Sequence, residues 1–354
     1  MADVKSLQQP SDVAIVVVNY RTPELTIRCV RSLQTERELL PTLRVVVVDG
    51  GSADSSAEIL REQFSAVEFH GWVQLVCLPI NGGFGWANNQ AIIGLLMGSE
   101  APDFIHLLNP DTVVEPGAVL ALLRQLQADP RAGAVGSQLL ELDGSPAGSA
   151  FPFPTIVGEF ARGARTGFID RLLRLPEPAV GPVRDPRPAD WVTGASVMIR
   201  SAALRETGLF DDGFFLYHEE VELMWRIRRR GWSIYLQPAS RVIHVGGAST
   251  GVHSRVVEER VARRKPAYWY QSRRRFFART RGVYAARAAW LAWIVGHCFW
   301  RLRGWIGVNG ASKPVADELR DWVVHAFPRR SDCDSPNLAY DVLPGRLPGW
   351  MESQ

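Results

Sequence analysis

Runs of β-branched residues near the start of the chain constrain the fold more than any other feature. Residues 13–20, "VAIVVVNY", and residues 43–48, "LRVVVV", carry apolar side chains at consecutive rather than alternate positions. Strands that are buried on both faces have this pattern, which is typical of parallel sheets covered by helices. The start of the sequence therefore predicts buried strands in an α/β fold.

Helical patterns alternate with these strands and with two later ones. We expect strands at residues 13–20, 43–48, 73–80 and from Phe104 onward, and helices between them at residues 23–33, 55–64 and 92–97. Such a series predicts a wound, mainly parallel sheet flanked by helices. Residues 144–188, rich in Pro, Gly and Arg, are expected to form a long surface loop.

Polar or glycine-bearing residues follow each of the four predicted strands. They are Asn19-Tyr20, Asp49, Asn81-Gly82-Gly83 and Asn109-Pro110-Asp111. Any one of them could be a simple turn, since Asn, Asp, Gly and Pro favour chain reversals. Ligands of open parallel sheets bind beyond the carboxyl ends of the strands, so the four together predict a binding edge.

Two common nucleotide-binding motifs are absent from the sequence. A dinucleotide fold needs G-x-G-x-x-G after the first strand, whereas residues 19–23 contain no glycine. The phosphate-binding pattern G-x-x-x-x-G-K-[ST] does not occur either. A dehydrogenase and a P-loop enzyme are therefore disfavoured.

Charge and cysteine content narrow the partners and the compartment. The net charge of +3 over 354 residues is small, so no nucleic-acid partner is expected. The four cysteines are far apart, and the amino terminus lacks the apolar core of a signal peptide. No apolar run reaches the roughly 20 residues that span a bilayer. A cytoplasmic setting is expected.

A charged helix is predicted within "FFLYHEEVELMWRIRRRGW", ending near Gly231. Glu220 shares a face with the apolar residues of this helix, and it could either compensate the helix dipole or act as a general base facing a cleft. The other face is expected to be solvated and structural. It carries Glu219, Glu222, Arg226 and Arg229, with an ion pair between Glu222 and Arg226.

A histidine follows the next predicted strand. His244 precedes a glycine pair at residues 246–247, where backbone can approach a ligand closely. A structural histidine and a ligand-binding one both fit this position.

These motifs together resemble the family 2 inverting glycosyltransferases of the GT-A fold, in particular bacterial rhamnosyltransferase-like members. The matching stretches are "VVVNY", "VVDGGSADSS", "NGGFGWANNQA", "LLNPDTVV", "DWVTGASVMIR", "GLFDDGFFLYHEEVELMWRIRRRGW" and "VIHVGGASTG". The resemblance implies a nucleotide-sugar-binding and catalytic domain at residues 11–251 and a helical, basic C-terminal extension at residues 252–354.

The resemblance also implies a metal site. Asn109-Pro110-Asp111 stands where the family has its Asp-x-Asp motif, so Asp111 would hold a divalent metal, Mg²⁺ or Mn²⁺, that bridges the sugar nucleotide diphosphate. His244 matches a family histidine near the same metal. The nucleotide sugar itself would be bound by Asn19, Tyr20, Asp49, Asn81, Gly83, Asn88, Asn109 and Asp111.

The acidic pair of the family aligns with Glu219-Glu220. Glu220, where the family usually has aspartate, would be the catalytic base that deprotonates the acceptor hydroxyl. Trp191 and Glu219 would border the acceptor, with Trp191 as a platform for stacking a sugar. Arg273 and Arg275 could approach an anionic substrate.

The expected function is therefore transfer of a sugar, with L-rhamnose favoured, from a nucleotide diphosphate donor to a glycan or lipid-linked glycan acceptor. The alternatives are a sugar nucleotidyltransferase and a non-catalytic carbohydrate-binding protein on the same fold. Metal-dependent binding of a nucleotide diphosphate would distinguish an enzyme from a scaffold.

A possible membrane contact is predicted at residues 287–306, "RAAWLAWIVGHCFWRLRGWI". On a helix Trp290, Trp293, His297 and Trp300 form one aromatic stripe, flanked by Arg287, Arg301 and Arg303. The stripe could pack as ordinary core, or it could lie on anionic lipid at the inner face of the cell membrane.

Overall fold

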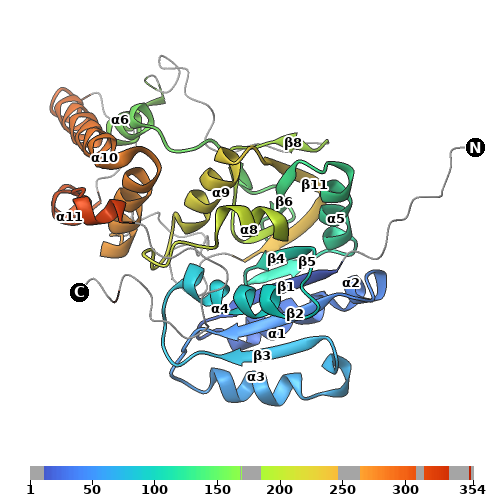
Figure 1. Ribbon diagram of the computed structural model, residues 1–354. Coiled ribbons are helices and arrows are strands. Elements are labelled where there is room, and N and C mark those ends of the chain that lie inside the picture. Colours follow the sequence, from blue (N-terminus) through green and yellow to red (C-terminus); the bar gives the residue numbers. More distant parts are fainter. Residues whose placement is uncertain are drawn as a thin grey trace, which may run out of the picture.

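A single large sheet runs through the molecule, with helices on both of its faces (Figure 1). The computed structural model describes residues 12–167, 169, 185–245, 264–307, 315–334 and 351. The main sheet has nine strands in the order β3-β2-β1-β4-β10-β6-β11-β5, and β8 pairs with β11 beside this path. Strands β7 and β9 form a separate pair.

The first half of the sheet is parallel, as the sequence predicts. Strand β1 pairs in parallel with β2 and with β4, and β2 pairs in parallel with β3. The strands are β1 (Val13–Asn19), β2 (Arg44–Asp49), β3 (Val73–Cys77) and β4 (Phe104–Leu108), and the helices are α1 (Pro23–Ser32), α2 (Gln34–Leu39), α3 (Ser56–Phe64) and α4 (Phe84–Met97), with the 3₁₀ turn η1 (Val67–Phe69). The α/β class and the wound sheet are confirmed.

Helix α4 begins eight residues earlier than the predicted residue 92. Gly83 precedes it with a φ of 92°, a conformation that glycine adopts without strain, and the chain turns directly into the helix. A Cβ at Gly83 would lie 2.0 Å from the carbonyl oxygen of Phe215, so only glycine fits this approach. The helical start was hidden because residues 85–89 are buried on all sides and show no amphipathic period.

The second half of the sheet reverses direction. Strand β10 (Ser196–Arg200) runs antiparallel to both β4 and β6 (Ala132–Leu140), and β11 (Ser233–His244) returns parallel to β6. The short strand β5 (Thr112–Val114) pairs antiparallel with the end of β11, with His244 opposite Thr112. This pairing brings the end of β11 beside the end of β4.

The remaining elements surround this half. They are α5 (Ala118–Ala128), β7 (Ala150–Phe151), α6 (Ile156–Ala164), β8 (Arg187–Pro188), β9 (Trp191–Val192), α8 (Ser201–Thr207), α9 (Glu219–Arg229), α10 (Ala267–Trp305), α11 (Glu318–His325) and η2 (Arg330–Cys333). The predicted surface loop at residues 144–188 therefore contains α6, although residues 168 and 170–184 lie outside the described part. The predicted domain boundary at residues 251 and 252 also lies outside it and stays a prediction.

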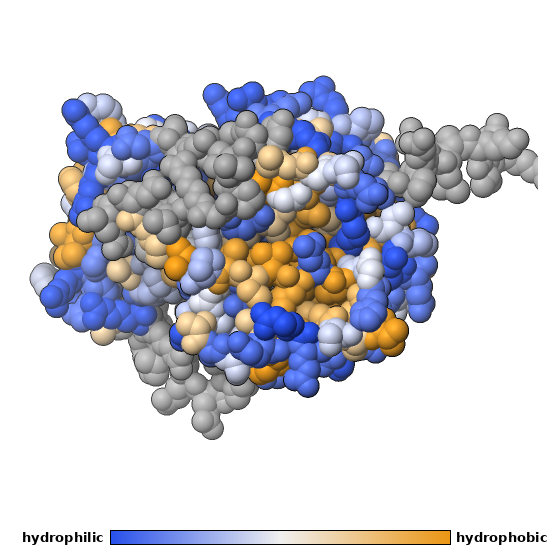
Figure 2. Space-filling model, turned by 60° about the horizontal axis from the view of Figure 1, so that its bottom comes forward, coloured by the Kyte–Doolittle hydropathy of each residue, from blue (hydrophilic) through white to orange (hydrophobic). Residues whose placement is uncertain are grey.

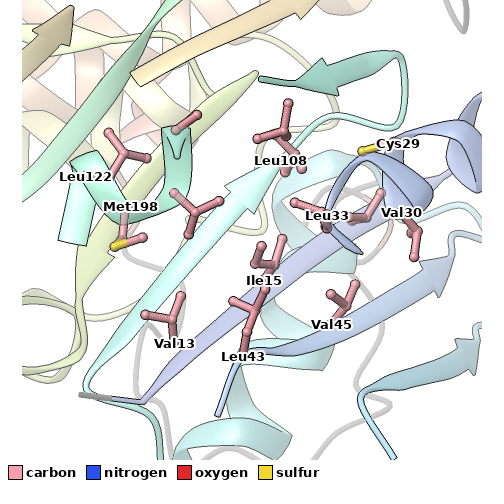
Figure 3. Close-up of a cluster of buried hydrophobic side chains, with 14 of the residues drawn as sticks. Val13, Ile15, Cys29, Val30, Leu33, Leu43, Val45, Leu108, Leu122 and Met198 are labelled. Carbon is pink, nitrogen blue, oxygen red and sulfur yellow. The ribbon is translucent and has the colours of Figure 1, made fainter. Parts of the chain in front are cut away.

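Two apolar layers enclose the sheet. One packs β1 and β2 against α1 and α5, and Figure 3 shows Ile15, Val45 and Leu33 meeting within it. The other packs α4, α8 and α9 against the opposite face. The consecutive apolar side chains of the first strands are buried because helices cover both faces.

The C-terminal helices pack on α6 and α9, and Figure 1 shows α6, α10 and α11 gathered at one end of the molecule. Gly163 of α6 and Gly296 of α10 let the two backbones touch, since a Cβ at Gly163 would lie 2.3 Å from the carbonyl oxygen of Trp293. A Cβ at Gly296 would lie 2.1 Å from the carbonyl oxygen of Phe160. Any larger residue would push the helices apart.

The aromatic stripe of α10 faces this packing rather than solvent. Trp293, His297 and Trp300 are buried, and the Trp293 ring lies 4.5 Å from that of Trp322 on α11. The stripe is therefore core, and its predicted lipid contact is corrected. The opposite face of the helix is the exposed one, and it carries Tyr284, Leu291, Val295, Phe299, Leu302 and Ile306. Sequence could not choose between the two faces because both are apolar.

Within the described ranges, none of the helices has the length and apolar content needed to cross a membrane. In the view of Figure 2, hydrophilic side chains frame a central area in which apolar side chains gather. Further apolar side chains lie at the left edge of that view, the end of the molecule that the C-terminal helices occupy in Figure 1.

Candidate functional site

A cavity of about 510 Å³ lies at the carboxyl ends of the first strands, where the sequence predicts a binding edge. Its lining brings together residues from β1, α4, α9, β11 and α10 and from the loop that follows β4. The predicted site residues that line it are Tyr20, Asn81, Gly83, Asn109, Asp111, Glu219, Glu220 and His244. Residues more than 200 positions apart in the sequence therefore share one cavity.

The pairing of β5 with β11 brings Asp111 and His244 together. The backbone N–H of Val245 donates to the carbonyl oxygen of Asp111 at 3.0 Å, and His244 Nε2 lies 3.2 Å from Asp111 Oδ1. Among the described residues His244 Nε2 has no hydrogen-bond partner, although it is buried. The glycine pair after His244 lies outside the described residues. The carboxylate and the imidazole are therefore in contact at the edge of the cavity.

This pair fits a divalent metal. An acidic oxygen and a neutral imidazole nitrogen are both metal ligands, and an orphaned buried nitrogen beside a carboxylate is what a bound cation would satisfy. The described residues contain no cluster of three or more His, Cys, Asp or Glu side chains around one metal position. Mg²⁺ is commonly held by one or two carboxylates together with substrate phosphates and waters, so a sparse protein ligand set suits it.

The acidic pair sits at the first turn of α9, on the same cavity. Glu219 Oε2 and Glu220 Oε2 are buried and have no hydrogen-bond partner within the described residues. Burial raises the pKa of Glu220 to about 7. Burial and the neighbouring Glu220 charge raise the pKa of Glu219 well above its usual range. Burial therefore favours the neutral form of Glu219, while Glu220 can exchange a proton near pH 7.

Backbone strain precedes this pair. Tyr217 and His218 both have positive φ, at 71° and 67°, which costs about 1–3 kcal/mol for each non-glycine residue. Helix α10 holds the strained segment: Ser272 Oγ donates to the carbonyl oxygen of Leu216 at 2.8 Å, and Arg273 Nη1 lies 3.3 Å from His218 Nε2. The surrounding contacts thus fix where α9 begins and where Glu220 points.

Two arginines predicted to approach an anionic substrate form ion pairs with buried carboxylates instead. Arg273 forms an ion pair with the fully buried Glu159 of α6. Arg275 forms one with Asp211, which is also fully buried. A guanidinium neutralised by a buried carboxylate has little charge left for a substrate, so both residues are corrected to structural roles.

The predicted solvated face of α9 is also corrected. The ion pair between Glu222 and Arg226 exists, with Nη2 2.9 Å from Oε2, but Glu222 is only 2% exposed. Arg226 also donates to the carbonyl oxygens of Thr207, Gly208 and Leu209. The pair ties α9 to the end of α8. Helical spacing identified the ion pair and could not reveal the chain that covers it.

Three predicted nucleotide-sugar ligands lie behind the cavity lining. Asn19 Nδ2 donates to Asp49 Oδ1 at 2.7 Å, and Ser52 Oγ donates to the same oxygen at 2.6 Å. Asn19 and Asp49 are buried and hold the loops that carry the lining residues Tyr20 and Gly50. Asn88 is buried in α4, where its Nδ2 donates to the carbonyl oxygen of Phe84.

Trp191 is not among the residues that line this cavity. Its ring stacks on Phe151 with centroids 4.6 Å apart, and its Nε1 donates to the carbonyl oxygen of Pro152 at 3.0 Å. The aromatic residues in the lining are instead Tyr20, Phe84, Phe215, Tyr217 and Tyr268. The last three were missed, although "FFLYHEE" and "AYWYQ" place aromatic residues beside the acidic pair and at the start of α10.

The profile of a known family, described as "Glycosyltransferase like family 2", matches residues 10–284. The N-acetylglucosaminyl-diphospho-decaprenol L-rhamnosyltransferase of Mycobacterium tuberculosis is 30% identical over 229 residues, which are 62% of this chain and 71% of that protein. A rhamnosyltransferase of Escherichia coli K12 is 24% identical over 168 residues, which are 46% of this chain and 60% of that protein.

A solved structure shares the fold. A mannosyltransferase from Pyrobaculum calidifontis, solved in complex with GDP-Man and Mn²⁺, superposes with a TM-score of 0.53 at 16% identity. The superposition covers 88% of this chain and 79% of that one.

Proposed function

The chain belongs to the glycosyltransferase like family 2 and is a glycosyltransferase, and from this premise we propose that it transfers L-rhamnose, with inversion, from a nucleotide diphosphate to a glycan or lipid-linked glycan. The relatives named as rhamnosyltransferases support the sugar, and the N-acetylglucosaminyl-diphospho-decaprenol in the name of one of them supports a lipid-linked acceptor. Family membership disfavours the nucleotidyltransferase and scaffold alternatives.

One observation carries the chemistry. Glu220, whose buried Oε2 has no hydrogen-bond partner among the described residues, shares a cavity with Asp111 and His244. Glu220 accepts the proton of the acceptor hydroxyl, and the hydroxyl oxygen attacks the anomeric carbon from the face opposite the diphosphate. The bond from the anomeric carbon to the diphosphate oxygen breaks, and that oxygen keeps the electron pair. Attack from the opposite face inverts the configuration.

Asp111 and His244 would hold a divalent metal, Mg²⁺ or Mn²⁺, on the donor side. When bound, such an ion offsets the negative charge of the departing diphosphate. The remaining donor contacts would come from Tyr20, Asn81 and Gly83, which line the cavity, while Asn19, Asp49 and Asn88 support them from behind. Asn109 lines the cavity beside Asp111.

A panel of nucleotide sugars tests this function. We expect deoxythymidine-diphosphate rhamnose with Mn²⁺ to give the largest rise in melting temperature, because a ligand stabilises the fold it binds. The same donor should then support transfer to a lipid-linked acceptor. A larger rise with a uridine or guanosine sugar would reassign the donor, and no metal-dependent rise with any of them would contradict the function.

The exposed face of α10 supports a second element of the proposal, peripheral contact with anionic lipid. Residues 283–307 contain three arginines and no acidic residue. The apolar side chains on the exposed face include Leu302, which is 55% exposed, and Ile306, which is 73% exposed. An apolar stripe beside arginines suits the interface of an anionic membrane, which is where a lipid-linked acceptor would be presented.

A further inference from the structure

One wall of the catalytic cavity is aromatic and has no part in the chemistry described above. Phe215, Tyr217 and Tyr268 line the same cavity as Glu220. The Tyr268 ring meets Phe215 edge-on with centroids 5.2 Å apart, and it lies nearly parallel to Tyr217 at 6.1 Å and 23°. The three rings form a continuous surface, and Tyr217 within it lies two residues before the acidic pair.

Tyr268 lies on the face of α10 that contacts the loop at residues 211–218. Tyr268, Ser272, Arg275 and Arg279 recur at helical spacing, and the last three all bind that loop. Ser272 holds the carbonyl of Leu216, and the two arginines hold Asp211. The position of Tyr268 relative to Phe215 and Tyr217 is therefore fixed before any ligand arrives, which lowers the entropic cost of binding.

The wall comes from other parts of the chain than most residues proposed for the donor side, although Gly83 lies against the carbonyl of Phe215. Tyr20 and Asn81 follow β1 and β3, and Asp111 follows β4, whereas the aromatic residues come from the loop before α9 and from α10. Aromatic rings offer a flat apolar body with a polar tip, and tyrosines keep their hydroxyls for hydrogen bonding. A pyranose ring matches this, since one face presents C–H groups and its edge presents hydroxyls.

We propose that Phe215, Tyr217 and Tyr268 form the acceptor subsite, which takes a pyranose sugar by its apolar face and directs one of its hydroxyls toward Glu220. This inference rests on the proposed transfer function and deepens it. It moves the sugar platform from Trp191 to the C-terminal helix, so residues beyond 251 complete the active site.

Steady-state kinetics of three variants test the subsite. Tyr268→Ala should raise the acceptor KM roughly tenfold and leave the donor KM unchanged, because loss of one stacking surface is worth about 1.4 kcal/mol. Tyr268→Phe keeps the ring and should stay within about twofold of the wild type. Val67→Ala shortens a side chain that is 84% exposed in η1 and does not line the cavity, and it should change neither KM.

A binding measurement separates this inference from the transfer function. Saturation-transfer NMR with methyl pyranosides, in the presence of a nucleoside diphosphate and Mg²⁺, should show contact with the wild type and with Tyr268→Phe. The contact should be lost in Tyr268→Ala, with the melting temperature confirming that the variant is folded. This readout holds even if the wild type transfers no sugar, an outcome that would sink the function alone.

Three results would overturn the subsite. A rise in donor KM with unchanged acceptor KM would assign the ring to the nucleotide. Equal impairment of Tyr268→Phe and Tyr268→Ala would show that the hydroxyl, and not the stacking surface, matters. Undiminished pyranoside contact in a folded Tyr268→Ala would place the acceptor elsewhere.

Discussion

The guanidinium of Arg275 spans both carboxylate oxygens of Asp211, with Nη2 2.8 Å from Oδ1 and Nε 3.1 Å from Oδ2. Arg279 adds a third contact, with Nε 3.0 Å from Oδ2. Asp211 is fully buried and opens the loop that leads to the acidic pair. The position of the candidate base therefore depends on a helix that follows it by about fifty residues.

Asp211→Asn should lower the free energy of unfolding by roughly 3–5 kcal/mol, because it leaves two guanidiniums without their buried counter-charge. Urea denaturation measures the change. Glu115→Gln is the matched control, since its ion pair with Arg241 is largely exposed and should be worth less than about 1 kcal/mol. Equal losses of unfolding free energy in the two variants would contradict the stabilising role of the Asp211 ion pairs.

Glu220→Gln should reduce transfer by roughly 10²–10⁴-fold with little change in donor affinity, because the amide keeps the shape but cannot take a proton. Turnover with saturating donor and titration calorimetry of the donor measure the two effects. Glu222→Gln serves as the comparison, since its carboxylate pairs with Arg226 and does not line the cavity. Near-normal turnover in Glu220→Gln would remove it as the base.

The pH dependence of activity should follow the raised pKa of Glu220. A base must be ionised, so turnover should be present above about pH 7 and fall as the pH drops through it.

Stability should show the opposite trend. Burial favours the neutral carboxyl, so ionisation costs stability as the pH rises from the unfolded pKa near 4.5 through about 7. Relative to the wild type, Glu220→Gln should have a raised melting temperature at pH 8 but not at pH 5.

Asp111→Asn and His244→Ala should each weaken the binding of metal and nucleoside diphosphate together, since one ion would join both groups. Isothermal titration with Mn²⁺ and the diphosphate, separately and combined, resolves the coupling. Asp143→Asn, on a solvent-exposed turn with Ser145, is the control. Unchanged metal-dependent affinity in both site variants would move the metal away from this pair.

The double variant Leu302→Ser with Ile306→Ser should weaken flotation with anionic vesicles and leave the fold intact, because both side chains are exposed. The wild type should bind phosphatidylglycerol vesicles in low salt and release them in high salt. Val67→Ser removes an exposed apolar residue elsewhere and should have no effect. Equal binding to phosphatidylcholine vesicles, or none at low salt, would exclude the contact.

Most of the parallel half of the fold could be predicted from sequence. Strands buried on both faces leave a strong signal, so β1 to β4 were located to within a few residues. The strand reversal at β10 was not predicted because strand direction depends on where a connection returns, which local patterns do not encode. The start of α4 was missed for a related reason, since a helix buried on all sides has no polar face to reveal its period.

The site was predictable where residues act from strand ends and helix starts. Asp111, His244, Glu219 and Glu220 occupy such positions, and all four line one cavity. Arg273 and Arg275 were misplaced because composition shows a charge but not its partner, while the acceptor role of Trp191 stays a prediction. Each arginine is committed to a buried carboxylate that lies far away in the sequence.

Tyr268 extends from the first turn of α10, whereas Tyr20, Asn81 and Asp111, proposed for the donor side, follow strands in the first third of the chain. Changes of donor and changes of acceptor can therefore accumulate in separate stretches of one gene. A chimera that exchanges the loop at residues 211–218 together with α10 between relatives should alter which glycan is extended while the activated sugar stays the same. Diversity of surface polysaccharides could arise by such recombination, without rebuilding the catalytic centre.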